Sequence, residues 1–178
     1  DCTMRQLAMA LAVGLAAMTG AAEAHGPSRL KTDQSVTLNA SPDEVWAVVG
    51  DFTDMSWYPG VAKVEATGND KGATRVRTME DGQVLHEELL KRDDERHAIS
   101  VRFTEDNLEA VKATNYASHI TLKDQGGKTL LDWKGAFYRA YPNNNPPADQ
   151  NDEASAASVE AAHQKGIDAL VERFGKAE

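Results

Sequence analysis

The segment of residues 35–61, SVTLNASPDEVWAVVGDFTDMSWYPGV, constrains the possible folds more than any other part of the chain. Apolar and polar residues alternate over residues 34–40, which predicts a first β-strand. A helix follows, because Ser41 can cap its first turn, Pro42 suits its first position and Glu44 can complete a capping box. Apolar residues then recur at the spacing of one helix face, at Val45, Val48, Val49 and Phe52.

The rest of the chain predicts a sheet and a long final helix. Residues 54–58 can form a second short helix, which Pro59-Gly60 would end. Residues 152–174 place apolar side chains along one stripe, which predicts a helix with one buried face. Six strand-like segments lie between, separated by turn sequences, at residues 61–67, 74–79, 83–92, 97–104, 113–122 and 128–138. This order predicts an α+β fold, in which a seven-stranded antiparallel sheet carries its helices on one side.

An export signal is predicted at the N-terminus. A positively charged start is followed by an apolar run over residues 7–18 and by Ala22-Glu23-Ala24, the pattern of a secretory signal peptide cleaved after Ala24. The run is shorter than the roughly 20 apolar residues that cross a bilayer. We therefore expect residues 1–24 to precede one domain of residues 25–178, which would be periplasmic and free of the membrane.

The composition excludes several classes of function. The net charge of −9 argues against nucleic acid and anionic membrane surfaces as partners. The single cysteine, Cys2, lies upstream of the predicted signal peptide, within residues 1–24, so we expect no disulfide and no thiolate metal site in the mature protein. The sequence carries no G-x-S-x-G, dinucleotide or P-loop motif, and its five histidines lack the spacing of metal ligands. We expect no cofactor.

Several motifs resemble those of the START/SRPBCC helix-grip superfamily. They are Ala40-Ser41-Pro42 through Val45-Trp46, Asp51-Phe52 with Trp57-Tyr58-Pro59, the last-strand sequence LDWKGAF at residues 131–137, and the closing helix. The resemblance covers residues 31–178. It implies a curved sheet around the long C-terminal helix with an apolar cavity between them. The superfamily includes polyketide cyclases and dehydratases, lipid carriers and non-catalytic binding proteins, so the fold alone does not define a function.

One branch of the superfamily resembles this chain more closely. The predicted mature start His-Gly-Pro, the FYRAY sequence of residues 137–141 and the Asn/Pro-rich loop before the last helix are similar to MxaD-type accessory proteins of bacterial methanol oxidation. This resemblance implies a periplasmic, non-catalytic protein. Its partners would be methanol dehydrogenase and the cytochrome c that accepts electrons from the dehydrogenase.

Aromatic side chains are the first group of candidate binding residues. Trp57 and Tyr58 would border the mouth of the cavity in a helix-grip fold, as a ligand lid or a partner anchor, or they would pack as a small satellite core. Trp133 and Phe137 share the apolar face of the last strand, where Phe137 is expected in the core and Trp133 could form a cavity wall. Tyr141 ends the FYRAY sequence and joins them as a candidate for ligand or partner contact.

Titratable side chains form the second group. His86 and Glu88 share one strand face and could act as an acid/base pair, but the neighbouring Glu87 and Lys91 favour a charged outer face. His119 could face the cavity or the solvent. Tyr116 lies three residues earlier, on the opposite face.

Two further histidines are expected in or near the interior. His97 precedes Ile99, Val101 and Phe103 on one strand face, which favours a half-buried position. His163 lies on the apolar stripe of the last helix, where it could line the cavity or bond within the core.

Three functions follow from these patterns. The first is the non-catalytic accessory protein, which tolerates a closed cavity and for which we expect an exposed apolar or aromatic patch. The second is a carrier of a small apolar ligand, which needs an open apolar cavity of about 300 Å³ or more. The third is a cyclase- or dehydratase-like enzyme using His86, Glu88 or His119, which needs at least two titratable side chains converging in the cavity.

Overall fold

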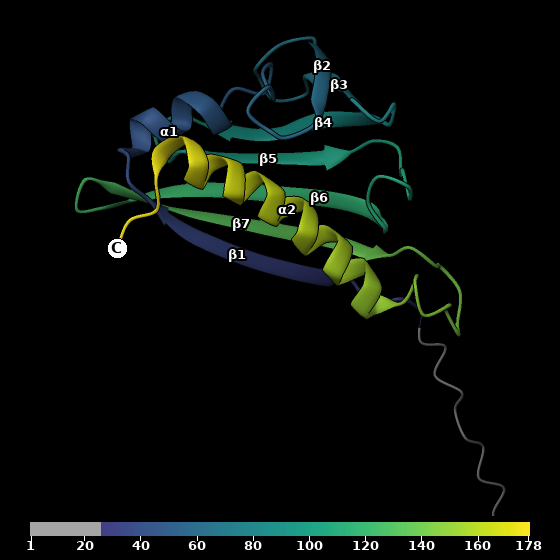
Figure 1. The fold of residues 1–178 in the computed structure, drawn as a ribbon. Helices are drawn as coiled ribbons and strands as arrows, with labels where there is room; N and C mark the ends of the chain where they lie inside the picture. The colour runs from purple at the N-terminus through teal and green to yellow at the C-terminus, as the bar shows by residue number, and fades with distance from the viewer. Residues whose placement is uncertain (1–25) are drawn as a thin grey trace, which may run out of the picture.

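The structure is a computed structural model that describes residues 26–178, so the predicted signal peptide and its cleavage site lie outside the described residues. Within this range the chain forms one sheet and two helices, and α2 crosses one face of the sheet (Figure 1). The elements are β1 (Leu30–Leu38), α1 (Pro42–Val49), β2 (Val61–Ala66), β3 (Thr74–Met79), β4 (Val84–Asp93), β5 (Ala98–Phe103), β6 (Ala113–Gln125), β7 (Lys128–Arg139) and α2 (Asp152–Phe174).

The sheet has seven strands in the order β1-β7-β6-β5-β4-β3-β2, and every neighbouring pair is antiparallel. Strands β2 to β7 follow one another as a meander, and β1 pairs with β7. The two-residue turn Gly126-Gly127 joins β6 to β7, and both glycines have positive φ, as a tight hairpin of this length requires. The predicted α+β fold and its antiparallel sheet are confirmed.

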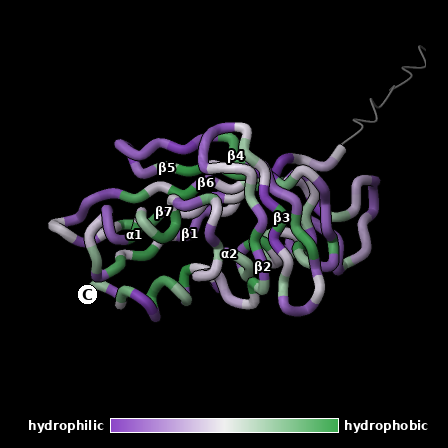
Figure 2. Tube along the Cα trace, turned by 90° about the horizontal axis from the view of Figure 1, so that it is seen from above, coloured by the Kyte–Doolittle hydropathy of each residue, from purple (hydrophilic) through white to green (hydrophobic). Residues whose placement is uncertain are grey.

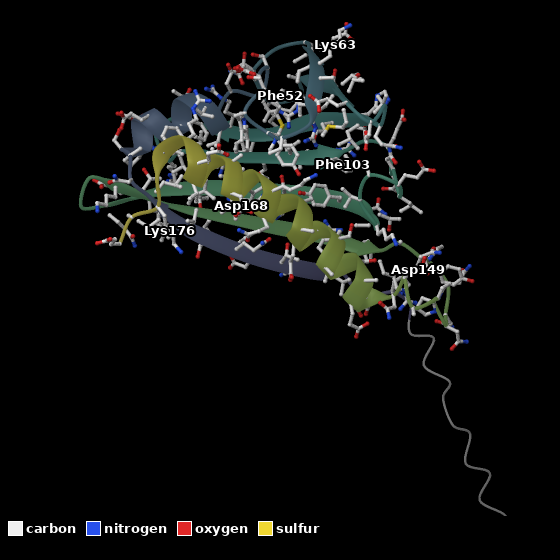
Figure 3. The ribbon with its side chains drawn as sticks, in the orientation of Figure 1. Phe52, Lys63, Phe103, Asp149, Asp168 and Lys176 are labelled. Carbon is white, nitrogen blue, oxygen red and sulfur yellow. The ribbon has the colours of Figure 1, made fainter. Side chains whose placement is uncertain are left out.

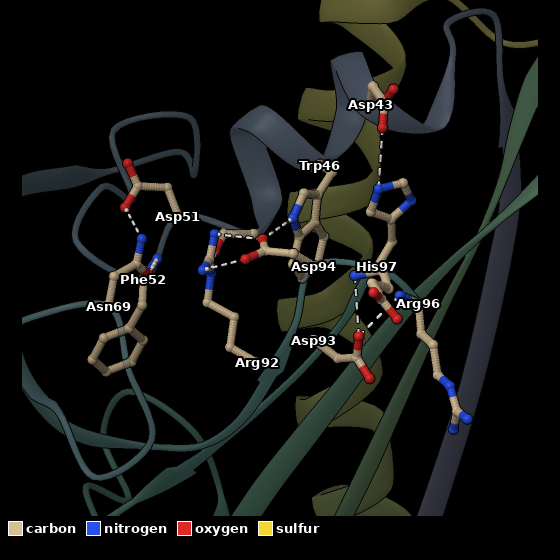
Figure 4. Close-up of polar contacts among 12 residues, drawn as sticks. Asp43, Trp46, Asp51, Phe52, Asn69, Arg92, Asp93, Asp94, Arg96 and His97 are labelled. Carbon is tan, nitrogen blue, oxygen red and sulfur yellow. Dashed lines mark hydrogen bonds and ion pairs between the residues drawn. The ribbon is translucent and has the colours of Figure 1, made fainter.

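Helix α1 begins at the predicted capping box. Ser41 Oγ accepts from the Glu44 backbone N–H, and the Glu44 carboxylate accepts from the Ser41 N–H at 2.9 Å. Side-chain contacts then fasten the helix to the turn between β4 and β5 (Figure 4). Trp46 Nε1 donates to Asp94 at 2.8 Å, and His97 Nε2 lies 3.2 Å from an Asp43 carboxylate oxygen. His97 is half-buried, as its strand position predicted.

Residues 54–58 form turns, so the predicted second short helix is wrong. The Asp54 carboxylate accepts from the Ser56 N–H at 2.8 Å, and the Asp51 carboxylate accepts from the Thr53 N–H at 3.0 Å. Aspartate side chains that bond backbone two residues ahead offer the chain an alternative to helical hydrogen bonds. These turns bring Trp57 over the sheet face that α2 covers.

Helix α2 has the bounds that its apolar stripe predicted. Asn151 caps its first turn by accepting from the Ala154 N–H at 2.8 Å, and Gly175 ends it with a φ of 83°. The helix contacts β1, β7 and β6, and after it the Asn39 N–H donates to the Gly175 carbonyl at 2.8 Å. The C-terminal end of α2 therefore lies beside the segment that enters α1 (Figure 1).

The core consists of two clusters of buried side chains on the α2 side of the sheet. The larger one joins α1, the middle of the sheet and the C-terminal half of α2, with Phe52, Leu131 and Leu170 fully buried. The smaller one includes Phe103 and Phe137 and meets the N-terminal half of α2. Hydrophobic residues recur along the strands between hydrophilic ones, and the loops at the periphery are largely hydrophilic (Figure 2). Charged side chains project from the exposed periphery (Figure 3).

Candidate functional site

A cavity of about 110 Å³ lies between the two core clusters, on the α2 side of the sheet. Strands β3 to β7 form one wall, and α2 and the turns of residues 51–58 form the other. Its apolar lining comes from both clusters and includes Val49, Leu85, Val101, Phe103, Val111 and Ile120. The fold therefore leaves a partly open space where the sheet and the long helix do not fully meet.

An aromatic wall closes one side of this cavity. The Trp133 and His163 rings stack with centroids 4.6 Å apart and planes 19° apart. The Trp57 ring lies 6.2 Å from Trp133, and the Tyr58 ring packs at right angles to Trp57. The Tyr58 hydroxyl donates to the Ala162 carbonyl at 2.7 Å, so the turns of residues 51–58 are fixed to α2. Burial raises the pKa of Tyr58.

Two glycines make room for the aromatic wall. A Cβ atom on Gly166 of α2 would lie 2.5 Å from Cζ3 of Trp133, which no carbon contact allows. A Cβ atom on Gly135 of β7 would lie 2.6 Å from Thr32 Oγ1 and 3.2 Å from Cε1 of His163. Because Gly135 and Gly166 have no side chain, α2 can approach β7 closely. This close approach sets the positions of Trp133 and His163.

A buried ion pair network forms the wall on β3 and β4. Arg75 and Glu87 are direct cross-strand partners, and Arg77 reaches the same carboxylate from two residues along β3. Arg75 Nε donates to one Glu87 oxygen, and Arg77 Nη2 donates to the other at 2.9 Å. Burial alone would raise the pKa of Glu87, but the guanidinium groups of Arg77 and Arg75 outweigh it, so the pKa is lowered.

Tyr116 and His163 meet across the cavity. The Tyr116 hydroxyl is hydrogen-bonded to His163 Nε2, and both side chains are buried. Tyr116 faces inward because it alternates along β6 with Ser118 and Ile120, and a bulge with one extra residue between Thr114 and Ala117 lies beside it. Burial raises the pKa of Tyr116 and lowers that of His163 to about 4, so both are uncharged near neutral pH.

Several polar atoms on the cavity-lining residues have no hydrogen-bond partner. Within residues 26–178, six buried side-chain nitrogen or oxygen atoms are unpartnered, and three of them belong to this lining: Arg77 Nε, Trp133 Nε1 and His163 Nδ1. Leaving a buried polar group unpaired costs about 1–3 kcal/mol, so such groups need an explanation in each case. Their residues line the cavity, so a bound molecule would lie beside Arg77, Trp133 and His163, although the three atoms themselves are covered in this structure.

Four of the candidate residues line the cavity: Trp57, Tyr58, Trp133 and His163. Trp57 and Tyr58 are half-buried and turn inward, so they do not form an exposed aromatic tip. Phe137 is fully buried in the smaller cluster, as the apolar face of the strand predicted. Tyr141 follows β7, outside the cavity lining, and its carbonyl accepts from Arg139 Nε at 2.9 Å.

The other candidates lie on the opposite face of the sheet. His86 and Glu88 point away from the cavity, where His86 lies 3.6 Å from the Glu105 carboxylate and Glu88 accepts from Arg102 at 2.7 Å. The expectation that Glu87 belongs to this charged outer face is wrong. Side chains alternate along β4, so Glu87 shares the inward face with Leu85 and Leu89.

His119 also lies on the outer face, opposite to Tyr116, as the spacing of the two residues predicted. Its Nδ1 is hydrogen-bonded to Ser100 Oγ, and burial together with Lys91 and Lys134 lowers its pKa. His119 borders an open groove of about 510 Å³ over β1, β7, β6 and β5. The groove is separate from the inner cavity, so His119 and His163 do not act on a common ligand.

Arg75, Arg77 and Glu87 are the main site residues that the sequence analysis missed. A signal for them exists, because Glu87 lies between Leu85 and Leu89 on an alternating strand and two arginines alternate on the preceding strand. A charge on an apolar strand face predicts a buried partner of opposite charge. In contrast, the contact between Tyr116 and His163 joins β6 to α2 and has no local signal.

Two further properties concern the described residues only. No three His, Cys, Asp or Glu side chains of residues 26–178 are grouped so that they could hold a metal ion. Within the same range, no helix has both the length and the apolar character needed to cross a membrane.

A curved antiparallel sheet that holds a long C-terminal helix over a partly polar cavity defines the helix-grip class of α+β proteins. The chain belongs to the family described as polyketide cyclase / dehydrase and lipid transport, whose model matches residues 29–175. The predicted membership of the SRPBCC superfamily is therefore confirmed. No curated protein matches the chain.

Solved structures with little sequence identity share the fold. An uncharacterised protein from Bacillus thuringiensis aligns with a TM-score of 0.69 and 23% identity, over 82% of this chain and 98% of the other. The protein XoxI from Bacillus cereus aligns with a TM-score of 0.66 and 24% identity, over 81% and 94% of the two chains. Truncated norcoclaurine synthase from Thalictrum flavum aligns with a TM-score of 0.61 and 15% identity, over 84% and 95%.

Proposed function

We propose that this protein binds a small molecule in the cavity between the sheet and α2, and that it acts as an exported binding protein without catalysing a reaction. The observation that carries the proposal is the partly open cavity, which has an aromatic wall and is lined by three residues with unpartnered buried polar atoms, Arg77, Trp133 and His163. Pockets that bind small molecules combine apolar walls with a few convergent polar groups. A plain core would fill this space with apolar side chains instead.

The size of the cavity limits the ligand. Its volume of about 110 Å³ is well below the roughly 300 Å³ at which pockets for drug-sized ligands begin. A carrier of a large apolar ligand, such as a lipid, would need a wider opening between α2 and the sheet. The bound molecule in this proposal is therefore small, with one apolar part against Trp57 and Trp133 and one polar part against Arg77.

The positions of the titratable groups favour binding over catalysis. His86, Glu88 and His119 lie on the outer face, so an enzyme built on them would work outside the cavity. Glu87 is held by two guanidinium groups, which keep it ionised and fully paired. A cyclase- or dehydratase-like alternative would have to use Tyr116 and His163, the titratable pair that meets in the cavity.

The proposed biological setting is methanol oxidation in the periplasm. The signal-like N-terminus and the similarity to MxaD-type proteins support it, and the acidic net charge of −9 suits contact with a basic protein surface. In this second proposal the protein assists methanol dehydrogenase in meeting its cytochrome c. Among residues 26–178 the exposed large apolar residues are Val84 and Leu108, so the apolar patch expected of an accessory protein is absent from this range and such a contact would be mainly polar.

A cavity-filling variant tests the binding proposal. Ala162 lines the cavity, and the adjacent Ala161 is exposed on the outer side of α2. We expect the purified wild type and Ala161→Leu to retain a small molecule from a cell extract at one per chain, detected by native mass spectrometry. Ala162→Leu should retain none. Retention of the same molecule by Ala162→Leu, or no retention by the wild type, would overturn the proposal.

The methanol-oxidation setting needs its own test. The protein would be immobilised and exposed to a periplasmic extract of a methylotroph grown on methanol, and bound proteins would be identified by mass spectrometry. The proposal predicts retention of methanol dehydrogenase or its cytochrome c, with release as salt is raised, since a polar contact is screened by ions. Absence of both proteins among the retained material would contradict it.

A further inference from the structure

We propose that the ligand of the inner cavity is a small monocarboxylate whose carboxylate lies against Arg77 and Trp133. This inference rests on the proposed binding function and names the chemical class that the site would select. Three properties of the cavity support it. They are the charge of its wall, the donors on its lining residues that lack a partner, and the apolar side chains that line the rest of it.

The buried wall carries an excess positive charge. Arg75 and Arg77 share one carboxylate, that of Glu87, and all three side chains are at least nine-tenths buried. Two guanidinium groups and one carboxylate leave one positive charge uncompensated in a region of low dielectric, where an unpaired charge is costly. A monoanion in the cavity would neutralise that charge.

The remaining lining groups do not supply this anion. Tyr116 and His163 are uncharged near neutral pH, because burial raises the pKa of the first and lowers that of the second. Asp51 is the other acidic residue of the lining, at the half-exposed end of the cavity. Its carboxylate is held in the surface turn by Thr53 and Asn69, and it is half-exposed, so solvent screens its charge from the arginines that pair with Glu87.

The unpartnered atoms are donors. Arg77 Nε and Trp133 Nε1 each carry a hydrogen and have no acceptor role, so only an acceptor can satisfy them. When the Tyr116 hydroxyl donates to His163 Nε2, the ring proton lies on Nδ1, which becomes a third donor without a partner. A carboxylate offers two oxygens and four acceptor positions, whereas an ammonium group has no acceptor position and would leave these donors unpaired.

The rest of the cavity suits an apolar body. Trp57, Trp133 and Phe103 present aromatic surfaces, and Val101 and Ile120 present aliphatic ones. A volume of about 110 Å³ excludes long acyl chains. Short aliphatic and single-ring carboxylates, represented by butyrate and benzoate, combine the required charge, size and apolar surface.

Isothermal titration calorimetry with matched ligand pairs tests the inference. Benzoate and butyrate would be compared with benzamide and butyramide, which keep the shape and lose the charge. We expect each carboxylate to bind at least about tenfold more tightly than its amide, because hydrogen bonds and ion pairs to a charged acceptor are the stronger ones. Amide binding equal to or tighter than carboxylate binding would overturn the inference and leave the binding function standing. Absence of binding by all four compounds would also overturn the inference, and the retention test of the wild type and Ala162→Leu would then decide whether the binding function stands.

Two variants locate the carboxylate. Trp133→Phe removes the Nε1 donor and keeps an aromatic ring, and it should reduce the preference for carboxylate over amide at least about fivefold. Trp46→Phe is the matched control, because Trp46 Nε1 donates to Asp94 outside the cavity and its loss should leave the preference unchanged. Arg77→Gln should abolish the preference if the variant folds. An unchanged preference in Trp133→Phe would overturn the placement of the carboxylate.

Discussion

Arg75 and Glu87 face each other across β3 and β4 with both side chains buried on the inner face of the sheet. Arg75 also donates through Nη1 to the Phe52 carbonyl at 3.0 Å, and its guanidinium lies over the Phe52 ring, 4.3 Å from the centroid. One arginine thus joins the strand pair to the chain that leaves α1. The buried charge that borders the cavity is for that reason also part of the framework that positions the turns of residues 51–58.

Glu87→Gln should destabilise the protein strongly. Removing one partner of a buried ion pair leaves uncompensated charge in the interior and costs about 3–5 kcal/mol. In this variant two guanidinium groups would remain without a carboxylate. The free energy of unfolding, measured by urea denaturation at pH 7, should fall by that amount.

Glu88→Gln is the matched control for this prediction. Glu88 is the next residue on the same strand, and its partner Arg102 has a side chain that is 46% exposed. Surface ion pairs contribute about 0–1 kcal/mol. Equal losses of stability in the two variants would show that the buried network has no special role.

Gly166→Ala should also destabilise the protein, although alanine favours a helix interior by about 1 kcal/mol over glycine. The added Cβ would lie 2.5 Å from Cζ3 of Trp133, and overpacking of a filled core costs about 1–3 kcal/mol. We expect a net loss of stability by thermal unfolding and a changed near-ultraviolet circular dichroism spectrum, because the Trp133 ring must move.

Gly68→Ala controls for the loss of a glycine as such. A Cβ atom at Gly68 would have no heavy atom within 4 Å, so the substitution should change stability by less than about 0.5 kcal/mol. A Gly166→Ala variant that is more stable than the wild type would contradict the tight contact between α2 and Trp133.

His163 should make the protein less stable as the pH falls. Burial lowers its pKa from 6.5 in the unfolded chain to about 4 in the folded one, so only the unfolded chain takes up a proton between these values. The free energy of unfolding should therefore decrease by about 3 kcal/mol from pH 6.5 to pH 4, and change no further on this account below pH 4. Above pH 6.5 His163 has no effect of this kind.

Urea denaturation of His163→Gln between pH 7 and pH 5 measures this contribution. Glu87 does not contribute to the slope in this pH range. Its stabilising effect is fully present above its unfolded pKa of 4.5 and is lost only as the pH falls below that value. His119→Gln serves as the comparison, because the pKa of His119 is lowered in the same direction at a half-buried position. The pH slope should flatten most in His163→Gln, and an unchanged slope in this variant would refute the assignment.

Local sequence patterns were sufficient for much of the fold. The bounds of helix α2 were predicted correctly because they depend on residues that are close together in the sequence. These are the apolar stripe of the helix and the polar loop before it. Strand β3 also has its predicted bounds, and the capping box of α1 follows from Ser41 and Glu44 alone. Residues 54–58 were predicted wrongly because Asp51 and Asp54 form side-chain turns that compete with a helix.

The site was predictable only where one element determines it. His163 and Trp133 were candidates for the cavity because each lies on the apolar face of its own element. The pairing of Tyr116 with His163 depends on the position of α2 over β6, which is a tertiary property. Arg77 and Glu87 were overlooked because a charged residue was assigned to the surface by its type, without regard to the alternation of its strand.

The central claim is tested most directly by following the indole N–H signals of the three tryptophans in a ¹H–¹⁵N NMR titration with benzoate. Binding in the inner cavity predicts that the Trp133 signal shifts and saturates, because its unpartnered N–H gains an acceptor. The Trp46 signal should stay in place, because Trp46 remains bonded to Asp94. Shifts confined to the outer groove around His119, with the Trp133 signal unmoved, would contradict the account.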